Sequence, residues 1–345
     1  MKGVQLTGHG GLDQLTIRDD IAVPTPGPRD VLIRVGAAGV NNTDLNTRIG
    51  WYAKSEGDSS NAGWNGEGLT FPRIQGADVC GEVVAMGADV DPAVLHQRVL
   101  IEPCLQEAHG QALAQPWYFG SECDGGFAQY TVVAARHAHA INSPLSNVEL
   151  ASFPCSYSTA ENMLTRAHVV ASDVVLVTGA SGGVGSAAIQ LAKARGATVI
   201  AVTSPAKAEA LLYLGASQTL GRNADLVKAL GANSVTVVID LAAGPQWPNL
   251  LEVLKPFGRY ATAGAIAGPM VELDVRTLYL KDLSLFGCTV LGDTVFANLV
   301  RRIEAGDIRP LVAQTFPLDQ IREAQTRFET KAHIGKLVLE MPQQP

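Results

Sequence analysis

The feature that most constrains the fold of this chain is a glycine-rich turn between an apolar segment and a segment of small residues. Residues 173–178 form a β-branched run that predicts a buried strand. The turn at 179–185 follows, residues 186–193 carry apolar side chains at helical spacing, and a second apolar run occupies 197–203. Strand, turn, helix and strand within about thirty residues predict a βαβ unit.

A turn of this kind presents backbone N–H groups and the N-terminus of a helix to an anion, because glycine lets the backbone approach closely. The sequence therefore predicts a dinucleotide site in which the turn binds the pyrophosphate. The expected contacts are Ala180, Ser181, Gly182, Gly183, Val184 and Gly185. A glycine turn that has only a structural role remains the alternative.

The end of the second strand indicates which nucleotide is bound. Sites that prefer NAD usually place an Asp or Glu about twenty residues beyond the glycines, on the ribose 2′-hydroxyl. Residues 202–207 read Val-Thr-Ser-Pro-Ala-Lys and contain no acid. Ser204 can donate a hydrogen bond, and Lys207 and Arg222 supply positive charge for a 2′-phosphate. NADP is predicted over NAD, the alternative being that Lys207 and Arg222 are solvated surface charges.

Length and charge limit the class of protein. A chain of 345 residues that is 47% hydrophobic suits two cores. The net charge of −7, without a basic run, argues against nucleic acid and anionic membranes as partners. The five cysteines are odd in number and widely spaced, and are expected to be reduced. Because neither a signal-peptide core nor a long apolar span occurs, we expect a cytoplasmic protein.

The pattern of apolar and turn-forming residues changes along the chain. Residues 1–146 contain short apolar runs broken by Gly, Pro and Asn, which predict a β-rich domain. Residues 147–290 alternate strands and helices, which predicts a doubly wound parallel sheet. Residues 291–345 are expected to return to the first domain. The polar, glycine-rich segment 53–70 lacks periodicity and predicts a long loop. His137 and His139 alternate along a predicted strand, and both are expected at the surface.

Several motifs in order resemble the medium-chain dehydrogenase/reductase superfamily. They are Gly-Val-Asn-Asn-Thr-Asp at 39–44, Gly-Ala-Asp-Val-Cys-Gly-Glu-Val at 76–83, Asp-Gly-Gly-Phe-Ala-Gln-Tyr at 124–130, Ser-Thr-Ala at 158–160, the glycine turn, and Gly-Lys-Leu-Val-Leu at 335–339. The resemblance implies an α/β protein with a GroES-like β-rich catalytic domain over 1–146 and 291–345. It also implies a Rossmann dinucleotide-binding domain over 147–290.

The resemblance also bears on zinc. Zinc alcohol dehydrogenases that resemble this chain carry cysteine at the position of Asn41, histidine at that of Ala77 and cysteine at that of Cys155. Only Cys155 remains, although a catalytic zinc needs three strong protein ligands. Residues 101–123 hold only Cys104 and Cys123, too few for a structural zinc. The chain therefore resembles the zinc-independent branch, the quinone oxidoreductases and enoyl reductases, whose Asn, Asp, Arg, Gly and Tyr pattern recurs over 41–52.

We expect hydride transfer from NADPH to a small carbonyl, quinone or α,β-unsaturated carbonyl compound. Tyr52 is the candidate for polarising the acceptor oxygen or delivering a proton, with Asn41 beside it; the alternative is that Tyr52 is only a pocket wall. Asp44 is expected to hold its neighbours in place. The resemblance further implies cofactor contacts from Thr159, Gly264, Ala265, Ile266 and Lys336.

Two other functions remain open. One is an alcohol dehydrogenase acting on a small alcohol or aldehyde, with an atypical metal site built from Cys155, Asp78 or Asp44. The other is a nucleotide-binding protein without activity, since a fold does not imply a function.

The apolar strand predicted at 283–290 would form the edge of the Rossmann sheet. Its pairing with a second copy predicts a homodimer.

Overall fold

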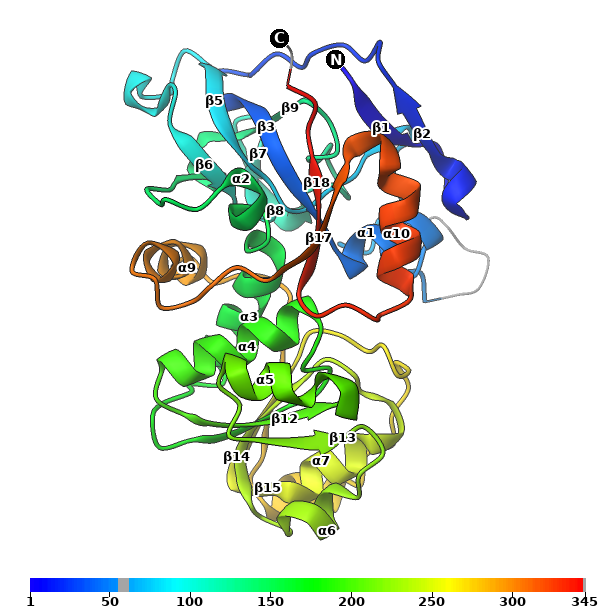
Figure 1. The fold of residues 1–345 in the computed structure, drawn as a ribbon, viewed down its shortest axis with the longest axis vertical. Coiled ribbons are helices and arrows are strands. Elements are labelled where there is room, and N and C mark those ends of the chain that lie inside the picture. Colours follow the sequence, from blue (N-terminus) through cyan, green and yellow to red (C-terminus); the bar gives the residue numbers. More distant parts are fainter. Residues whose placement is uncertain (55–61, 344–345) are drawn as a thin grey trace. The chain divides into compact units, whose positions relative to one another are not determined.

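The computed structural model describes residues 1–54 and 62–343, in which the chain forms two units (Figure 1). Unit 1 comprises Met1–Cys155 and Pro310–Pro345, and unit 2 comprises Ser156–Arg309. These units differ at their ends from the domain ranges expected above. Helix α2 (Asn147–Leu150) contacts strands of unit 1, and α9 (Val295–Glu304) falls within unit 2.

A six-stranded sheet forms the centre of unit 2, and all its neighbouring strands are parallel. Its order is β13-β12-β11-β14-β15-β16. The strands are β11 (Val174–Val177), β12 (Thr198–Thr203), β13 (Gln218–Gly221), β14 (Val235–Asp240), β15 (Leu254–Thr262) and β16 (Ser284–Gly287). The order reverses between β11 and β14, and ligands of doubly wound sheets bind at the carboxyl ends of strands beside such a switch point.

Helices cover both faces of this sheet, which explains why its central strands are apolar on both sides. Figure 1 shows α4 and α5 on one face and α6 and α7 on the other. Leu176, Val238, Leu250 and Tyr260 belong to the core between the sheet and its helices. The helices of unit 2 are α3 (Pro154–Arg166, begun in unit 1), α4 (Gly183–Ala194), α5 (Ala208–Leu214), α6 (Leu226–Leu230), α7 (Trp247–Val253), α8 (Val275–Leu280) and α9.

Unit 1 is built mainly from antiparallel strands. Its largest sheet has the order β10-β6-β5-β3-β18-β17, with β9 also paired to β3; β2-β1-β4 form a second sheet and β7-β8 a hairpin. The strands are β1 (Gly3–Leu6), β2 (Leu15–Arg18), β3 (Asp30–Val40), β4 (Arg73–Ile74), β5 (Cys80–Met86), β6 (Arg98–Ile101), β7 (Cys104–Ala108), β8 (Gln111–Tyr118), β9 (Tyr130–Ala134), β10 (Ala138–Ala140), β17 (Val312–Pro317) and β18 (Lys336–Glu340). Helices α1 (Asn42–Ile49) and α10 (Ile321–Glu329) complete it.

One pairing in unit 1 determines the position of the candidate site. Strand β18 runs antiparallel to β3, with Leu337 opposite Val40. The C-terminal segment therefore lies beside the point where β3 ends and α1 begins. As a result, Lys336 at the start of β18 lies next to Asn41 at the start of α1.

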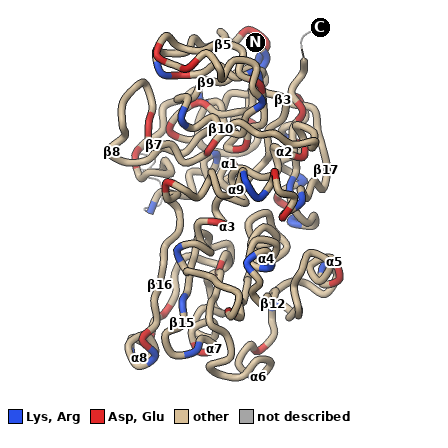
Figure 2. The backbone as a smooth tube through the Cα atoms, turned by 90° about the vertical axis from the view of Figure 1, so that its left-hand side faces the viewer, with Lys and Arg blue, Asp and Glu red and all other residues tan. Residues whose placement is uncertain are grey.

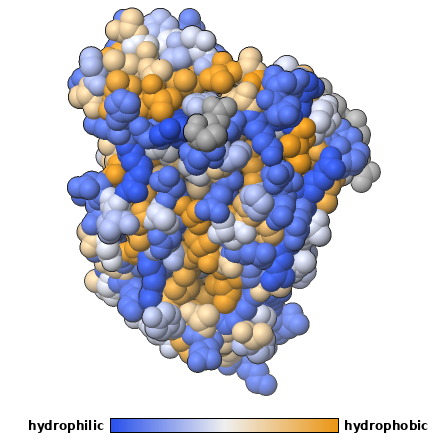
Figure 3. Space-filling view, turned by 45° about the horizontal axis from the view of Figure 1, so that its top comes forward, coloured by the Kyte–Doolittle hydropathy of each residue, from blue (hydrophilic) through white to orange (hydrophobic). Residues whose placement is uncertain are grey.

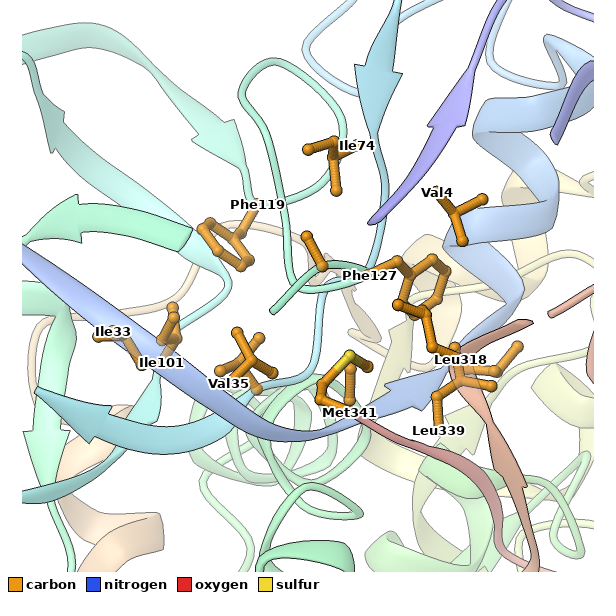
Figure 4. Packing of buried hydrophobic residues seen from close by; sticks show 14 of the residues in the cluster. Val4, Ile33, Val35, Ile74, Ile101, Phe119, Phe127, Leu318, Leu339 and Met341 are labelled. Carbon is orange, nitrogen blue, oxygen red and sulfur yellow. The ribbon is translucent and has the colours of Figure 1, made fainter. Parts of the chain in front are cut away.

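The core of unit 1 joins residues from distant parts of the chain. Figure 4 shows Phe119 and Phe127 among aliphatic side chains that include Val35, Leu339 and Met341. Phe127 and Leu339 are fully buried. Burying one such side chain contributes roughly 1.5–3 kcal/mol, so this cluster holds the C-terminal strand against the N-terminal half of the unit.

His137 is not at the surface, so that expectation was wrong. Its Nδ1 lies 3.1 Å from the Glu102 carboxylate, and its Nε2 accepts hydrogen bonds from the backbone N–H groups of Gln106 and Glu107. The side chain is buried in this polar network. His137 ends the 3-10 helix Ala135–His137 and does not lie on β10, so strand alternation does not set its direction. A histidine can be buried when both ring nitrogens have partners.

The surface of the described residues carries charges of both signs. Figure 2 shows acidic and basic residues interspersed along the chain, and Figure 3 shows hydrophobic patches among hydrophilic residues on one face. No helix among residues 1–54 and 62–343 is long and apolar enough to cross a membrane. Unit 2 exposes several large apolar side chains near its last strand, namely Ile266, Met270, Val271, Val275, Tyr279, Leu280, Leu285 and Val290.

Candidate active site and nucleotide-binding loop

The glycine turn of unit 2 connects β11 to α4. Gly179 has a φ of +55°, which favours glycine, and Gly182 is the N-cap residue of α4. A methyl group at Gly185 would collide with the carbonyl oxygen of Gly179 and the Cα atom of Ala180. The turn can therefore pack closely against the helix, which leaves the first N–H groups of α4 at the carboxyl edge of the sheet.

The structure places four of the predicted cofactor residues at this edge. Lys207 follows β12, and its Nζ lies 3.4 Å from Ser181 Oγ in the glycine turn. Arg222 follows β13 directly, and the pKa of Lys207 is lowered by burial and, secondarily, by the positive charge of Arg222. Ser204 is the N-cap residue of the short 3-10 helix Pro205–Lys207. This edge therefore carries two neighbouring cations and two hydroxyl groups.

The other predicted cofactor residues of unit 2 lie on α3 and after β15. Gly264 follows the end of β15, and its carbonyl oxygen is 3.3 Å from Thr262 Oγ1. Ile266 is 65% exposed, and Thr159 is a half-buried residue of α3. Because β11 and β15 belong to one parallel sheet, the segment 264–266 leaves the same edge as the glycine turn.

In unit 1, Asp44 fixes the start of α1. Its carboxylate accepts hydrogen bonds from the backbone N–H groups of Asn41, at 2.7 Å, and of Gly76, at 3.2 Å. Gln75 adds a bond from its side-chain amide to the carbonyl oxygen of Asp44. Burial raises the pKa of Asp44 to about 7. Asp44 therefore joins α1 to the segment at 75–76.

A buried ion pair lies beside it. Lys336 Nζ is 2.6 Å from Asp78 Oδ2, and the two side chains are 2% and 0% exposed. Asn41 bridges the pair, because its Oδ1 accepts from Lys336 Nζ and its Nδ2 donates to Asp78 Oδ2 at 2.8 Å. The backbone N–H of Cys155 donates to the second Asp78 oxygen. Both ends of the Asn41 amide and the Lys336 ammonium are thus engaged within this cluster.

Two tyrosines supply hydroxyl groups near the cluster. Tyr52 OH lies 2.9 Å from Thr43 Oγ1, and Tyr118 OH lies 3.1 Å from Cys155 Sγ. Burial raises the pKa of Tyr52 to about 12, so its phenol stays protonated at neutral pH. Trp64 packs on Tyr118 with ring centroids 4.9 Å apart. The sequence analysis did not predict a role at this site for Thr43 or Tyr118. Thr43 could have been found from its place within the 41–52 motif.

Comparison with known proteins places this geometry in a family. Residues 27–143 match the model of the alcohol dehydrogenase GroES-like domain, and residues 183–305 match that of the zinc-binding dehydrogenases. A solved structure from Sinorhizobium meliloti, described provisionally as an alcohol dehydrogenase, is 47% identical, covers 99% of this chain and 97% of its own, and has a TM-score of 0.91. The chain belongs to the medium-chain dehydrogenase/reductase superfamily.

More distant members of the superfamily carry two kinds of name. The quinone oxidoreductase of Lama guanicoe is 28% identical, over 98% of this chain and 97% of its own length. The NAD-dependent alcohol dehydrogenase of Saccharolobus solfataricus is 27% identical, over 93% and 95%. The expected fold, a GroES-like domain with a Rossmann domain, is confirmed, and the chain is an oxidoreductase of a nicotinamide-dependent family.

The superfamily includes zinc enzymes, but the groups that surround Cys155 and Asp78 do not fit a zinc ion. No group of three or more His, Cys, Asp or Glu side chains within the described ranges could hold a metal. Both oxygens of Asp78 are taken, one by Lys336 and Asn41 and the other by the Cys155 N–H. Asn41 and Ala77 stand at two of the ligand positions of the zinc enzymes, so Cys155 alone cannot supply the three strong protein ligands that a catalytic zinc needs.

The raised pKa of Asp44 predicts a pH-dependent contribution to stability. Its folded-state pKa of about 7 exceeds the ordinary value of 3.8, so the folded state holds this proton more tightly than the unfolded state. The stabilisation of the folded state by the proton on Asp44 is complete below about pH 4 and is lost as the pH rises to about 7. The free energy of unfolding of the wild type, relative to Asp44→Asn, should therefore fall by the order of a few kcal/mol between pH 5 and 8.

Urea unfolding of both proteins at several pH values measures this difference. Glu340→Gln, at an exposed carboxylate of unit 1, is the matched control and should show a difference that does not change over the same range. A pH-independent difference for Asp44→Asn as well would contradict the raised pKa.

Proposed function

We propose that this chain is an NADPH-dependent oxidoreductase that transfers a hydride to a small carbonyl, quinone or α,β-unsaturated carbonyl acceptor without zinc. The observation that carries the proposal is the meeting of Ser181, Lys207 and Arg222 where β11, β12 and β13 end. A ribose 2′-phosphate forms charge-assisted hydrogen bonds with such groups. No acid stands between the end of β12 and Lys207 to repel it.

Bound NADPH supplies the hydride. The protein has to stabilise the charge that develops on the acceptor oxygen, and preorganised hydrogen-bond donors do this without a metal. We assign that role to Tyr52, whose phenol is protonated at neutral pH and held by Thr43. Asn41, Asp44 and Lys336 then act as the buried frame of the site, because their polar atoms bond to one another and to Asp78.

A second candidate is oxidation or reduction of a small alcohol or aldehyde. Its support is the 47% identity to the Sinorhizobium meliloti protein and the similarity to an NAD-dependent alcohol dehydrogenase. This candidate requires either a metal or another electrophile for the alcohol oxygen. Both oxygens of Asp78 already have protein partners, and this favours the first candidate.

We also propose that two copies of the chain pair through β16. This strand ends the sheet of unit 2, and no other described strand pairs with its outer side. Apolar side chains are exposed beside it, including Leu285 on β16 and Tyr279 and Leu280 on α8. An uncovered edge strand with apolar neighbours favours pairing with an identical strand about a two-fold axis.

Removing one cation from the edge should weaken binding of NADPH selectively. Lys207→Ala or Arg222→Ala should each raise the Kd for NADPH by about tenfold or more, because one charge-assisted contact to the 2′-phosphate is lost. The Kd for NADH should change by less than about twofold. Lys255→Ala, at an exposed position on β15, is the matched control. Fluorescence titration measures all four proteins, and equal weakening of both nucleotides would argue against a 2′-phosphate site.

Tyr52→Phe tests the proton donor. The substitution should lower kcat for a quinone or enone acceptor by about ten- to a hundredfold, because general acid catalysis is lost. The Kd for NADPH should stay the same. Tyr130→Phe, at a half-buried position on β9, is the control and should leave kcat unchanged. Unchanged turnover in Tyr52→Phe would make Tyr52 a pocket wall and the solvent the proton donor.

The proposed pairing predicts a dimer mass in sedimentation equilibrium. Leu285→Glu places a charge on β16 and should give a monomer, because like charges would meet across the strand pair. Leu212→Glu, at a comparably exposed position on α5, should leave the dimer intact. A monomeric wild type at micromolar concentration would contradict the pairing.

A further inference from the structure

A fully buried carboxylate, Asp240, lies at the carboxyl end of β14. Thr178 Oγ1 donates to one of its oxygens and Tyr260 OH to the other. The backbone N–H of Ala242 donates to Oδ1 at 2.9 Å, and that of Ala243 lies 3.2 and 3.1 Å from the two oxygens. Asp240 therefore accepts hydrogen bonds from the ends of both neighbouring strands and from the loop that follows its own strand.

Thr178 extends this network. It follows the last residue of β11 and immediately precedes the glycine turn. Its Oγ1 donates to Asp240 and also accepts from the backbone N–H of Leu241 at 2.9 Å. One threonine hydroxyl thus joins the base of the glycine turn to the carboxylate and to the first residue of the loop at 241–244.

The loop at 241–244 separates the two segments of unit 2 that were assigned to the cofactor. A methyl group at Gly179 would lie 3.2 Å from Leu241 Cβ, and one at Gly264 would lie 3.2 Å from the carbonyl oxygen of Leu241. The N–H of Ala267 donates to the carbonyl oxygen of Ala242 at 2.9 Å. The loop therefore touches the glycine turn on one side and the segment after β15 on the other.

The backbone of this loop requires external support. Ala243 has a φ of +52°, a conformation that costs free energy for a residue with a side chain. Such a residue persists where surrounding bonds determine its conformation. Here the N–H of Ala243 is held by Asp240, so the carboxylate fixes the strained residue itself.

We propose that Asp240, acting through Thr178 and Tyr260, is a positioning residue for the dinucleotide. It sets the spacing between the glycine turn and the segment 264–266 by fixing the loop between them. This inference rests on the proposed function, in which both segments contact NADPH. Groups that bind one ligand from two segments must be held within a fraction of an ångström. Loosening the loop therefore weakens binding of the dinucleotide. Asp240, Thr178 and Tyr260 are not themselves among the predicted cofactor contacts.

The sheet offers a matched pair of threonines for the test. Thr236 lies near the opposite end of β14, where its Oγ1 donates to Asp173 at 2.7 Å and accepts from the backbone N–H of Val174 at 2.9 Å. Thr178 makes the same two kinds of bond at the cofactor edge. Thr178→Val and Thr236→Val therefore remove equivalent hydrogen bonds from opposite ends of one sheet.

Thr178→Val should raise the Kd for NADPH by about tenfold or more, and Thr236→Val by less than about twofold. Both should lower stability by similar amounts, and Thr178→Ser should restore the affinity. In the protein without nucleotide, amide hydrogen exchange should be faster at residues 241–244 in Thr178→Val and unchanged there in Thr236→Val.

Equal effects of the two valine variants on the Kd, or none, would overturn the inference while leaving NADPH binding by the wild type intact. A wild type that binds neither nucleotide would overturn the proposed function and the inference together. Should Thr178→Val fail to fold, Tyr260→Phe replaces it. Its control is then Tyr157→Phe, at a buried tyrosine of unit 2 whose hydroxyl donates to the carbonyl oxygen of Arg309.

Discussion

The parallel pairing of β11 with β12 and β14 determines how the carboxyl edge of the sheet in unit 2 is built. The register places Leu176 beside both Ile200 and Val238, so the three strands end close together. The cofactor contacts that we assign to the sheet of unit 2 all follow the carboxyl end of β11, β12, β13 or β15. Residues far apart in sequence, such as Ser181 and Lys207, therefore lie in contact because the strands beneath them are hydrogen-bonded in parallel.

Unit 1 depends on a different long-range contact. The antiparallel pairing of β18 with β3 delivers Lys336 to Asp78 and Asn41. Such a buried pair contributes little net stability, yet removing one partner costs about 3–5 kcal/mol because a charge is left buried alone. The pair therefore fixes the geometry where the polypeptide enters α1, and it occupies the carboxylate that would otherwise be available to a metal.

Much of the fold was predictable because the sequence encodes local periodicity. The β-branched runs at 173–178 and 197–203 and the glycines between them predicted strands, turn and helix in nearly the observed positions. The charged residues at the end of β12 and β13 were likewise visible, because in a parallel sheet the carboxyl ends of the strands share one edge.

Partners of buried polar groups could not be predicted, because they come from distant strands. The sequence gives no sign that Lys336 bonds to Asn41, that His137 is enclosed by Glu102 and a backbone turn, or that Tyr52 meets Thr43. Nor does the sequence show that Asp240 bonds to Thr178, directly after β11, and to Tyr260 on β15. Local pattern determines which face is apolar, whereas tertiary packing determines which polar atoms meet.

We have proposed that this chain reduces its acceptor with NADPH and without zinc. Metal analysis by mass spectrometry, on protein purified without chelator, should be combined with NADPH oxidation by a quinone and an enone before and after chelation. We expect far less than one zinc per chain and activity that survives the chelator. One zinc per chain, with turnover of small alcohols that is lost on chelation, would contradict it.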